Sequence, residues 1–168
     1  MLANKSSFGG VFTATCYDKD GNLKWSEDFP NLVVNVGLQF INQQVFVGSN
    51  YTATWYMGLV NTGATYNAAN TMSAHVTWTE NTDYLQSNRP LITFITPTTA
   101  NPSVTVSDVV TFTISANATI AGAFITTSNT KAGTTGTLLS VGNFTVGDRG
   151  LVSGDTLNVT YTFSAATA

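Results

Sequence analysis

The charged residues of this chain are unevenly distributed, and one long stretch contains none. From Phe29 to Thr79 there is no Asp, Glu, Lys or Arg, and Thr, Asn and Ser take the polar positions. Thr is β-branched and fits the pleated surface of a sheet, whereas the exposed faces of soluble helices normally carry charges. The stretch therefore favours a β-rich protein with a structural or binding role.

The composition fits one globular domain, and we expect residues 1–168 to form a single domain. The apolar share of 43% is ordinary, but only 9% of the residues are charged, against about 25% in an average soluble domain. The net charge of −3 gives little repulsion between copies. Solubility must come from hydroxyls and amides, or from burial of the surface in an assembly.

Three features of the sequence argue against a nucleic-acid partner, a membrane-spanning segment and a secreted protein. The 6 basic residues are scattered, so no basic stripe is available to bind a phosphate backbone. No apolar run approaches the roughly 20 residues that span a bilayer. Cys16 is the only cysteine, and the N-terminal residues lack the apolar core of a signal peptide. We therefore expect no nucleic-acid partner, no membrane association and synthesis in a cytosol.

A β-hairpin is the first predicted element. Val11–Tyr17 alternates between two faces, as a strand does. Asp20-Gly21-Asn22 follows, and Asp-Gly between two such runs is a strong hairpin signal. The returning strand would run from Leu23 to Phe29.

The same loop also begins like a calcium-binding loop, with oxygen-bearing side chains at Asp18, Asp20 and Asn22. The sixth position is Leu23 instead of Gly, and the twelfth is Phe29 instead of Glu. The sharp turn and the bidentate ligand of such a loop are both missing. We therefore interpret the segment as a turn and expect no metal.

One short helix is predicted over residues 35–46. Leu38, Ile41 and Val45 fall at the helical spacing i, i+3 and i+7, and Asn35 is a candidate N-cap.

The other predicted elements are strands. Trp55–Val60 is a compact apolar run that fits a strand buried on both faces. Several short strands with regular turn signals and a single helix predict a mainly β fold. We expect an antiparallel β-sandwich, either jelly-roll-like or immunoglobulin-like, with one short helix. The further strand candidates are Leu91–Ile95, Val110–Ile114, Ile120–Thr126, Thr137–Val141 and Leu157–Phe163.

A long excursion, residues 61–88, has no clear period and is rich in Asn, Thr and Ala. Loops longer than about 15 residues are usually functional, flexible or held by neighbours. Met72, His75, Trp78 and Tyr84 are spaced through it and are our candidate interface residues. Aromatic rings suit an interface because they carry large contact area at small entropic cost. Core packing is an equally open interpretation.

Catalytic chemistry has little support in this sequence. His75 is the only histidine, and nothing marks a nucleophile or an orienting acid for it. Cys16 lies inside a predicted strand, where a thiol is usually inert. Glu80 and Asp83 are a close acidic pair, but solvated or turn positions explain them better. We expect no enzyme activity, no catalytic residues and no cofactor, and we expect His75 to bond the backbone of the excursion.

Several motifs spread over nearly the whole chain are distinctive together. They are Asn35-Val36-Gly37-Leu38, Trp55-Tyr56-Met57-Gly58-Leu59, Asn70-Thr71-Met72 with His75, Trp78-Thr79-Glu80, Tyr84, Arg89-Pro90, Ala121-Gly122-Ala123-Phe124, the run from Lys131 to Leu138 and the run from Gly154 to Thr162. This set resembles a family of small virion proteins of tailed bacteriophages.

The resemblance implies a structural component of the phage particle. It implies a capsid decoration or cement protein on the outer surface of the head shell, which binds the major capsid protein and stabilises contacts between coat subunits. It also implies a homo-oligomer, a trimer or a dimer, that suits the symmetry axes of a shell. The excursion and the first hairpin would then carry the contacts. No catalytic residues come with the resemblance.

Two alternatives remain open at this point. The first is another virion component, from the tail, collar or fibre. The second is a carbohydrate-binding module in which Trp55, Tyr56 or Trp78 would stack on sugar rings.

Overall fold

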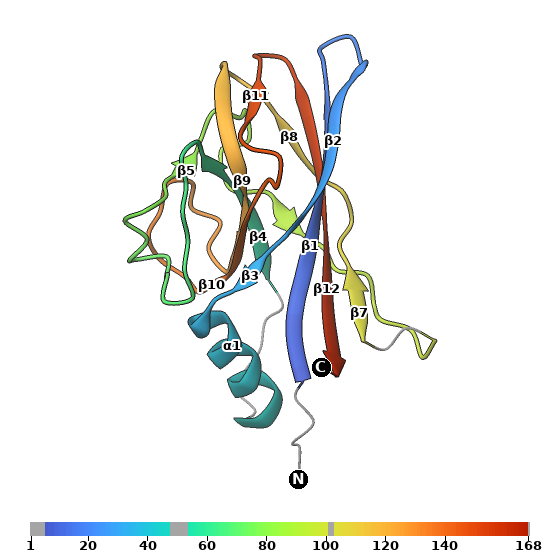
Figure 1. Ribbon diagram of the computed structural model, residues 1–168, viewed down its shortest axis with the longest axis vertical. Helices are drawn as coiled ribbons and strands as arrows, with labels where there is room; N and C mark the ends of the chain where they lie inside the picture. The colour runs from blue at the N-terminus through green and yellow to red at the C-terminus, as the bar shows by residue number, and fades with distance from the viewer. Residues whose placement is uncertain (1–5, 48–53, 101–102, 168) are drawn as a thin grey trace.

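The computed structural model describes residues 6–47, 54–100 and 103–167. Two antiparallel sheets pack face to face, and one helix lies at one end of the sandwich (Figure 1). The prediction of a mainly β sandwich with one short helix is therefore confirmed.

The first sheet has the strand order β2-β1-β12-β7, and β8 also pairs with β12. The order places the first and last strands of the chain side by side, in register from Ser6 opposite Thr167 to Tyr17 opposite Thr156. The strands are β1 (Ser6–Tyr17), β2 (Leu23–Pro30), β7 (Val104–Val106), β8 (Val110–Thr113) and β12 (Thr156–Thr167).

The second sheet has the order β3-β10-β9-β4-β5, and β11 pairs with β9 while β6 pairs with β4. Its strands are β3 (Leu32–Val33), β4 (Trp55–Asn61), β5 (Glu80–Asn81), β6 (Leu91–Ile92), β9 (Ala118–Thr126), β10 (Leu138–Asn143) and β11 (Arg149–Leu151).

The predicted hairpin joins β1 to β2. Gly21 has a φ of +84°, a conformation that glycine adopts without steric cost. The Asp18 carboxylate caps the turn, because Oδ1 accepts the N–H groups of Asp20 at 2.9 Å and of Asn22 at 2.8 Å. The Asn22 side-chain amide also donates to Asp18, at 2.9 Å from Oδ2, and this bond together with the backbone bonds holds the pKa of Asp18 below its usual value. Asp18 is thus a turn residue.

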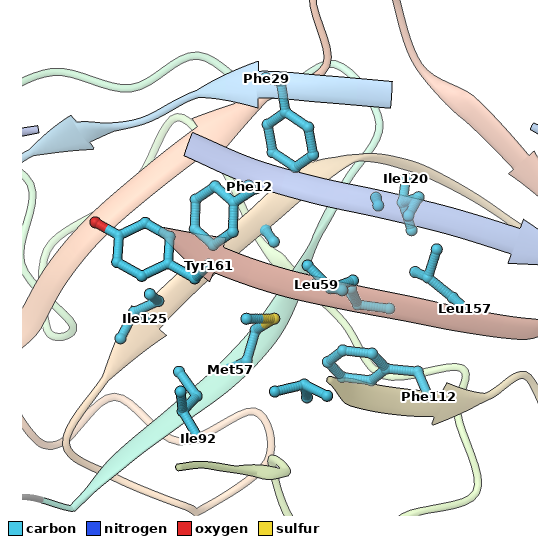
Figure 2. Close-up of a cluster of buried hydrophobic side chains, with 14 of the residues drawn as sticks. Phe12, Phe29, Met57, Leu59, Ile92, Phe112, Ile120, Ile125, Leu157 and Tyr161 are labelled. Carbon is cyan, nitrogen blue, oxygen red and sulfur yellow. The ribbon is translucent and has the colours of Figure 1, made fainter. Parts of the chain in front are cut away.

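The main core lies between the inner faces of the two sheets (Figure 2). Phe12 stacks on Phe29 with ring centroids 5.1 Å apart and packs against Tyr161 at 4.8 Å. Met57 and Ile125 face these rings from the second sheet. Burial of each such large side chain contributes about 1.5–3 kcal/mol, so this contact between sheets is a principal source of stability.

A second apolar cluster covers the outer face of the second sheet. Phe124 belongs to it, whereas its neighbour Ile125 belongs to the main core, as the alternation of a strand requires. Met72 and Trp78 from the excursion pack on this outer face. The prediction that the β4 run is buried on both faces is confirmed, because the excursion buries the face that the first sheet does not reach.

The helix begins at Asn35, one residue earlier than it would if Asn35 were the N-cap. Helix α1 spans Asn35–Asn42 and continues as the π-helical turn η1 (Gln43–Val47), which matches the predicted range. The predicted N-cap was wrong: Val34 is the N-cap and makes no side-chain cap bond. Val34 donates its N–H to the Leu139 carbonyl at 3.1 Å, so pairing with β10 decides where the chain leaves the sheet.

The predicted strand Leu91–Ile95 is shorter than expected. Only Leu91–Ile92 pairs with β4, and the next residues join the first sheet, where Ile95 donates its N–H to the Val106 carbonyl at 2.8 Å. The chain switches sheets here, so one strand cannot continue through the segment.

Gly37 allows helix α1 to approach β10 closely. A Cβ atom at this position would lie 2.4 Å from the backbone oxygen of Leu139, a distance that real contacts do not reach. Helix propensity favours Ala over Gly by about 1 kcal/mol, but overpacking costs about 1–3 kcal/mol. At position 37, the cost of overpacking therefore exceeds the gain in helix propensity that Ala would bring.

We expect Gly37→Ala to lower the free energy of unfolding by about 1–2 kcal/mol, because overpacking exceeds the gain in propensity. Urea denaturation measures the change. Asn42→Ala is the control, because Asn42 is exposed in the same helix and should be neutral or slightly stabilising. A more stable Gly37→Ala variant would contradict the close packing of helix and sheet.

Candidate functional site

Three of the four candidate interface residues are buried within the protomer. Met72, Trp78 and Tyr84 are at most 3% exposed. The Trp78 ring packs on Phe124 with centroids 5.1 Å apart, and the Tyr84 ring packs edge-on against Phe112 at 5.0 Å. These side chains support the fold and offer little of their own surface to a partner.

His75, the fourth candidate, is partly exposed and stacks on Trp78 with ring centroids 4.0 Å apart. Its Nδ1 lies 2.9 Å from the backbone oxygen of Trp78. A carbonyl can only accept, so Nδ1 carries the proton. The prediction that His75 bonds the backbone of the excursion is confirmed.

A buried ion pair fixes the end of the excursion. Arg89 and Glu80 side chains are 1% and 6% exposed, and they form a bidentate pair with Nε–Oε1 at 3.0 Å and Nη2–Oε2 at 2.8 Å. Arg89 also donates to the carbonyls of Ser128 and Gly133, and Glu80 accepts the N–H of Ala132 at 2.7 Å. The pair therefore ties the excursion to the loop between β9 and β10.

The residues considered for catalysis do not form a common site, because each has its own structural contacts. Asp83 accepts a bond from Asn81, so the acidic pair with Glu80 is used for structure. Burial, with the nearby Asp155 carboxylate, raises the pKa of Cys16 to about 12. A thiol in this state is a poor nucleophile.

The described ranges contain neither a metal-binding cluster nor a membrane-spanning helix. No group of three or more His, Cys, Asp or Glu side chains in these ranges could hold a metal ion. No helix of the described part of the chain is long and apolar enough to cross a membrane.

The β1–β2 hairpin lies at the end of the sandwich opposite helix α1 (Figure 1). Residues of this hairpin take part in the ion pairs Lys19–Asp20, Lys24–Asp155 and Arg149–Glu27. Lys24 pairs with Asp155, and Arg149 of β11 pairs with Glu27 of β2, with Nε 3.0 Å from Oε2. Thr145 also donates its N–H to Glu27 at 2.7 Å. Burial opposes ionisation of Glu27, but the bonds from Arg149 and Thr145 outweigh it and lower its pKa.

The opposite end carries three shallow hollows that share residues and form one continuous surface. Ile41 and Trp55 line the first two, and Pro97 and Thr105 line the second and third. The second hollow has a volume of about 290 Å³. We call this the helix-end surface; its lining includes Phe40, Ile41, Gln44, Val45, Trp55, Phe94, Ile95, Pro97, Val104–Val106 and Phe163.

The helix-end surface combines exposed apolar side chains with an absence of charge. No described residue that lines its hollows is Asp, Glu, Lys or Arg. At its margin, Phe46 is 81% exposed and Val47 75% exposed. The side-chain oxygen of Gln44 is buried and has no hydrogen-bond partner in the part of the chain that the structure describes. Such a surface is suited to contact with another apolar surface.

The sequence interpretation missed this surface as a site. Its residues come from the helix, from the start of β4 and from segments beyond residue 90, so no local motif joins them. The available signal was compositional, because the uncharged stretch from Phe29 to Thr79 includes the helix and β4.

Comparisons of the chain with protein-family models, with curated proteins and with solved structures found no match.

Removal of the Trp78 ring tests its role in the fold. We expect Trp78→Ala to destabilise the protein by about 3–5 kcal/mol, because the ring fills the outer cluster. Val76→Ala is the control, since Val76 is 99% exposed in the same segment and should change stability by less than about 0.5 kcal/mol. Thermal denaturation measures both. A Trp78→Ala variant as stable as the control would show that the ring does not support the fold, and Trp78 would again be a candidate interface residue.

The Glu27–Arg149 pair should make stability depend on pH. The pKa of Glu27 is lowered in the folded state. Its contribution to the free energy of unfolding is therefore complete above the ordinary glutamate pKa of about 4.3, and is lost as the pH falls through the folded-state pKa. We expect Glu27→Gln to cost about 2 kcal/mol at pH 7 and progressively less below pH 4. Urea titrations of both proteins across this range measure it. A cost that stays constant with pH would exclude this linkage.

Proposed function

We propose that this protein is a capsid decoration protein of a tailed bacteriophage, which binds the outer surface of the head shell and stabilises contacts between coat subunits. The supporting observation is the separation of its surface into an uncharged, apolar helix end and a charged hairpin end. The motifs that resemble small virion proteins support the same function.

The helix-end surface has the physical character of a binding site for another protein. Interface cores are depleted in charged residues and enriched in aromatic ones, and contiguous exposed apolar surface marks interaction sites. Trp55, Phe94 and Phe163 line this surface. A contact of this type depends little on ionic strength, because it contains few charges for salt to screen.

In this proposal the partner is the major capsid protein, which offers an apolar, largely uncharged surface at a seam between subunits. The charged hairpin end then faces solvent, where Lys19 and Asp20 are exposed. The excursion carries fewer of the contacts than its sequence suggested, because Met72, Trp78 and Tyr84 are used within the protomer.

A tail, collar or fibre component would use the same surface at a much lower copy number. The carbohydrate-binding alternative has less support, because Trp55 is 6% exposed and Trp78 3% exposed, which leaves only the partly exposed Tyr56 of its three candidate rings for stacking on a sugar. No observation favours the carbohydrate module over the virion component.

Copy number separates these possibilities. Quantitative mass spectrometry of purified particles from the source of this protein gives the ratio of this chain to the major coat protein. A ratio approaching that of the coat protein supports decoration of the head. A few copies per particle would assign the chain to the tail or collar, and absence from particles would refute a virion role.

Two matched substitutions test the helix-end surface. We expect Val47→Lys to weaken binding to undecorated heads by about 100-fold, because it would bury an unpaired charge. Val146→Lys at the hairpin end is the control, since Val47 and Val146 are both 75% exposed. Sedimentation of heads with bound protein measures the affinity. Equal binding by the two variants would place the contact elsewhere.

A further inference from the structure

The end of the excursion leaves the second sheet and lies beside strand β8 of the first sheet. Tyr84 forms an antiparallel bridge with Ile114, just beyond the end of β8. Leu85 then donates its N–H to the Thr113 carbonyl at 2.8 Å. Strand β8 pairs with β12 on its other side, so residues 84 and 85 cover part of the edge that β12 leaves free.

The side chain of Gln86 continues this cover where the backbone stops pairing. Its Oε1 accepts the Thr113 N–H at 3.3 Å, and its Nε2 donates to the Thr111 carbonyl at 3.1 Å. Backbone groups on one side of a strand come from every second residue, so Thr111 and Thr113 both face the excursion. A primary amide offers a carbonyl acceptor and N–H donors, as peptide groups do. The Gln86 side chain therefore fills the place that the backbone of a neighbouring strand would fill.

Lys131, in the loop between β9 and β10, holds this segment against β8. Its Nζ donates to the carbonyls of Tyr84 at 2.7 Å and of Gln86 at 3.1 Å. The same ammonium lies 3.8 Å from the centroid of the Tyr84 ring, which is a cation–π contact. The Tyr84 carbonyl and the Leu85 N–H belong to one trans peptide group and point in opposite directions. Lys131 therefore binds the side of the segment that faces away from β8.

We propose that residues 84–86, held by Lys131, form an edge strap that prevents β8 from pairing with a strand of another molecule. Strand β8 reads Val-Thr-Phe-Thr, which contains no charge and favours strand pairing. A free edge of this kind is a template for pairing with another chain. The strap thus replaces the charged side chains that protect many edge strands.

The low charge of the protein makes such protection necessary. The net charge of −3 gives little repulsion between copies that meet in solution. The strap covers the edge with groups of the same chain and so leaves contact with partners to other surfaces. This inference does not rest on the proposed function, because any protein of such low charge must remain dispersed before it meets a partner.

Removal of the Gln86 amide tests the strap. Gln86→Leu keeps the approximate size of the side chain and removes both bonds to β8. We expect the Thr113 amide to exchange its hydrogen about tenfold faster, because its described acceptor is lost. We also expect this variant to form species larger than the wild type at temperatures where it remains folded. Exchange is measured by NMR, and size by sedimentation velocity over a concentration series.

Two further variants separate edge pairing from other causes of association. Gln86→Glu cannot donate to Thr111, but its charge opposes an incoming strand, so it should be destabilised and stay at the wild-type size. Gln39→Leu adds the same apolar atoms at an exposed position of helix α1, away from a sheet edge, and should change neither exchange nor size.

Lys131→Met covers the case in which Gln86→Leu does not fold. It removes the bonds to the Tyr84 and Gln86 carbonyls and leaves the Gln86 amide in place. We expect the Leu85 amide to exchange about tenfold faster, and larger species to form more slowly than with Gln86→Leu.

Three results would overturn the proposal. One is an exchange rate at Thr113 that Gln86→Leu leaves unchanged. Another is faster exchange in Gln86→Leu or Lys131→Met without any species larger than the wild type. The third is association of Gln86→Glu or Gln39→Leu to the same extent as Gln86→Leu, since lost stability or added apolar surface would then explain the effect. These measurements use the purified protein alone, so they can fail independently of the binding tests with phage heads.

Discussion

Apolar side chains on both faces of the second sheet impose the constraint on which the rest of the structure depends. Phe124 and Ile125 are adjacent in β9, and both are fully buried although they point to opposite faces. The first sheet covers the inner face, so another segment must cover the outer one. The excursion does this with Met72 and Trp78. Leaving so much apolar surface in water would cost several kcal/mol, which explains why a long segment whose only strand is the two-residue β5 is well packed.

The buried charges secure this arrangement. Arg89 is bound by Glu80 and by two backbone carbonyls, so neither charge is left unpaired in the interior. A buried pair adds little net stability over an apolar core, but removal of one partner is costly, and the pair holds one loop arrangement. The buried aromatic residues of the excursion are used within the protomer, whereas the helix end combines exposed apolar side chains with an absence of charge. The proposed virion function rests on that surface together with the motifs that resemble small virion proteins.

Prediction from the sequence succeeded where a local pattern was enough. Asp20-Gly21 identified the first turn, apolar spacing identified the helix, and alternation identified most of the strands. The role of His75 also followed, because a lone histidine without partners is most often structural. The interface residues were harder: Trp78 and Tyr84 look the same in sequence whether they face a partner or the core. The strand Leu91–Ile95 was overextended because alternation does not reveal a change of sheet.

The sequence by itself determined the fold class, the hairpin, the helix and the low charge of the surface, because these depend on residues close together in the chain. Only the tertiary structure decided that β1 lies beside β12, that Arg149 pairs with Glu27 and that the excursion covers a sheet face. These contacts join segments far apart in sequence, and periodicity contains no information about which strands become neighbours. For the same reason, only the structure shows that β2 leaves the first sheet before β12 ends.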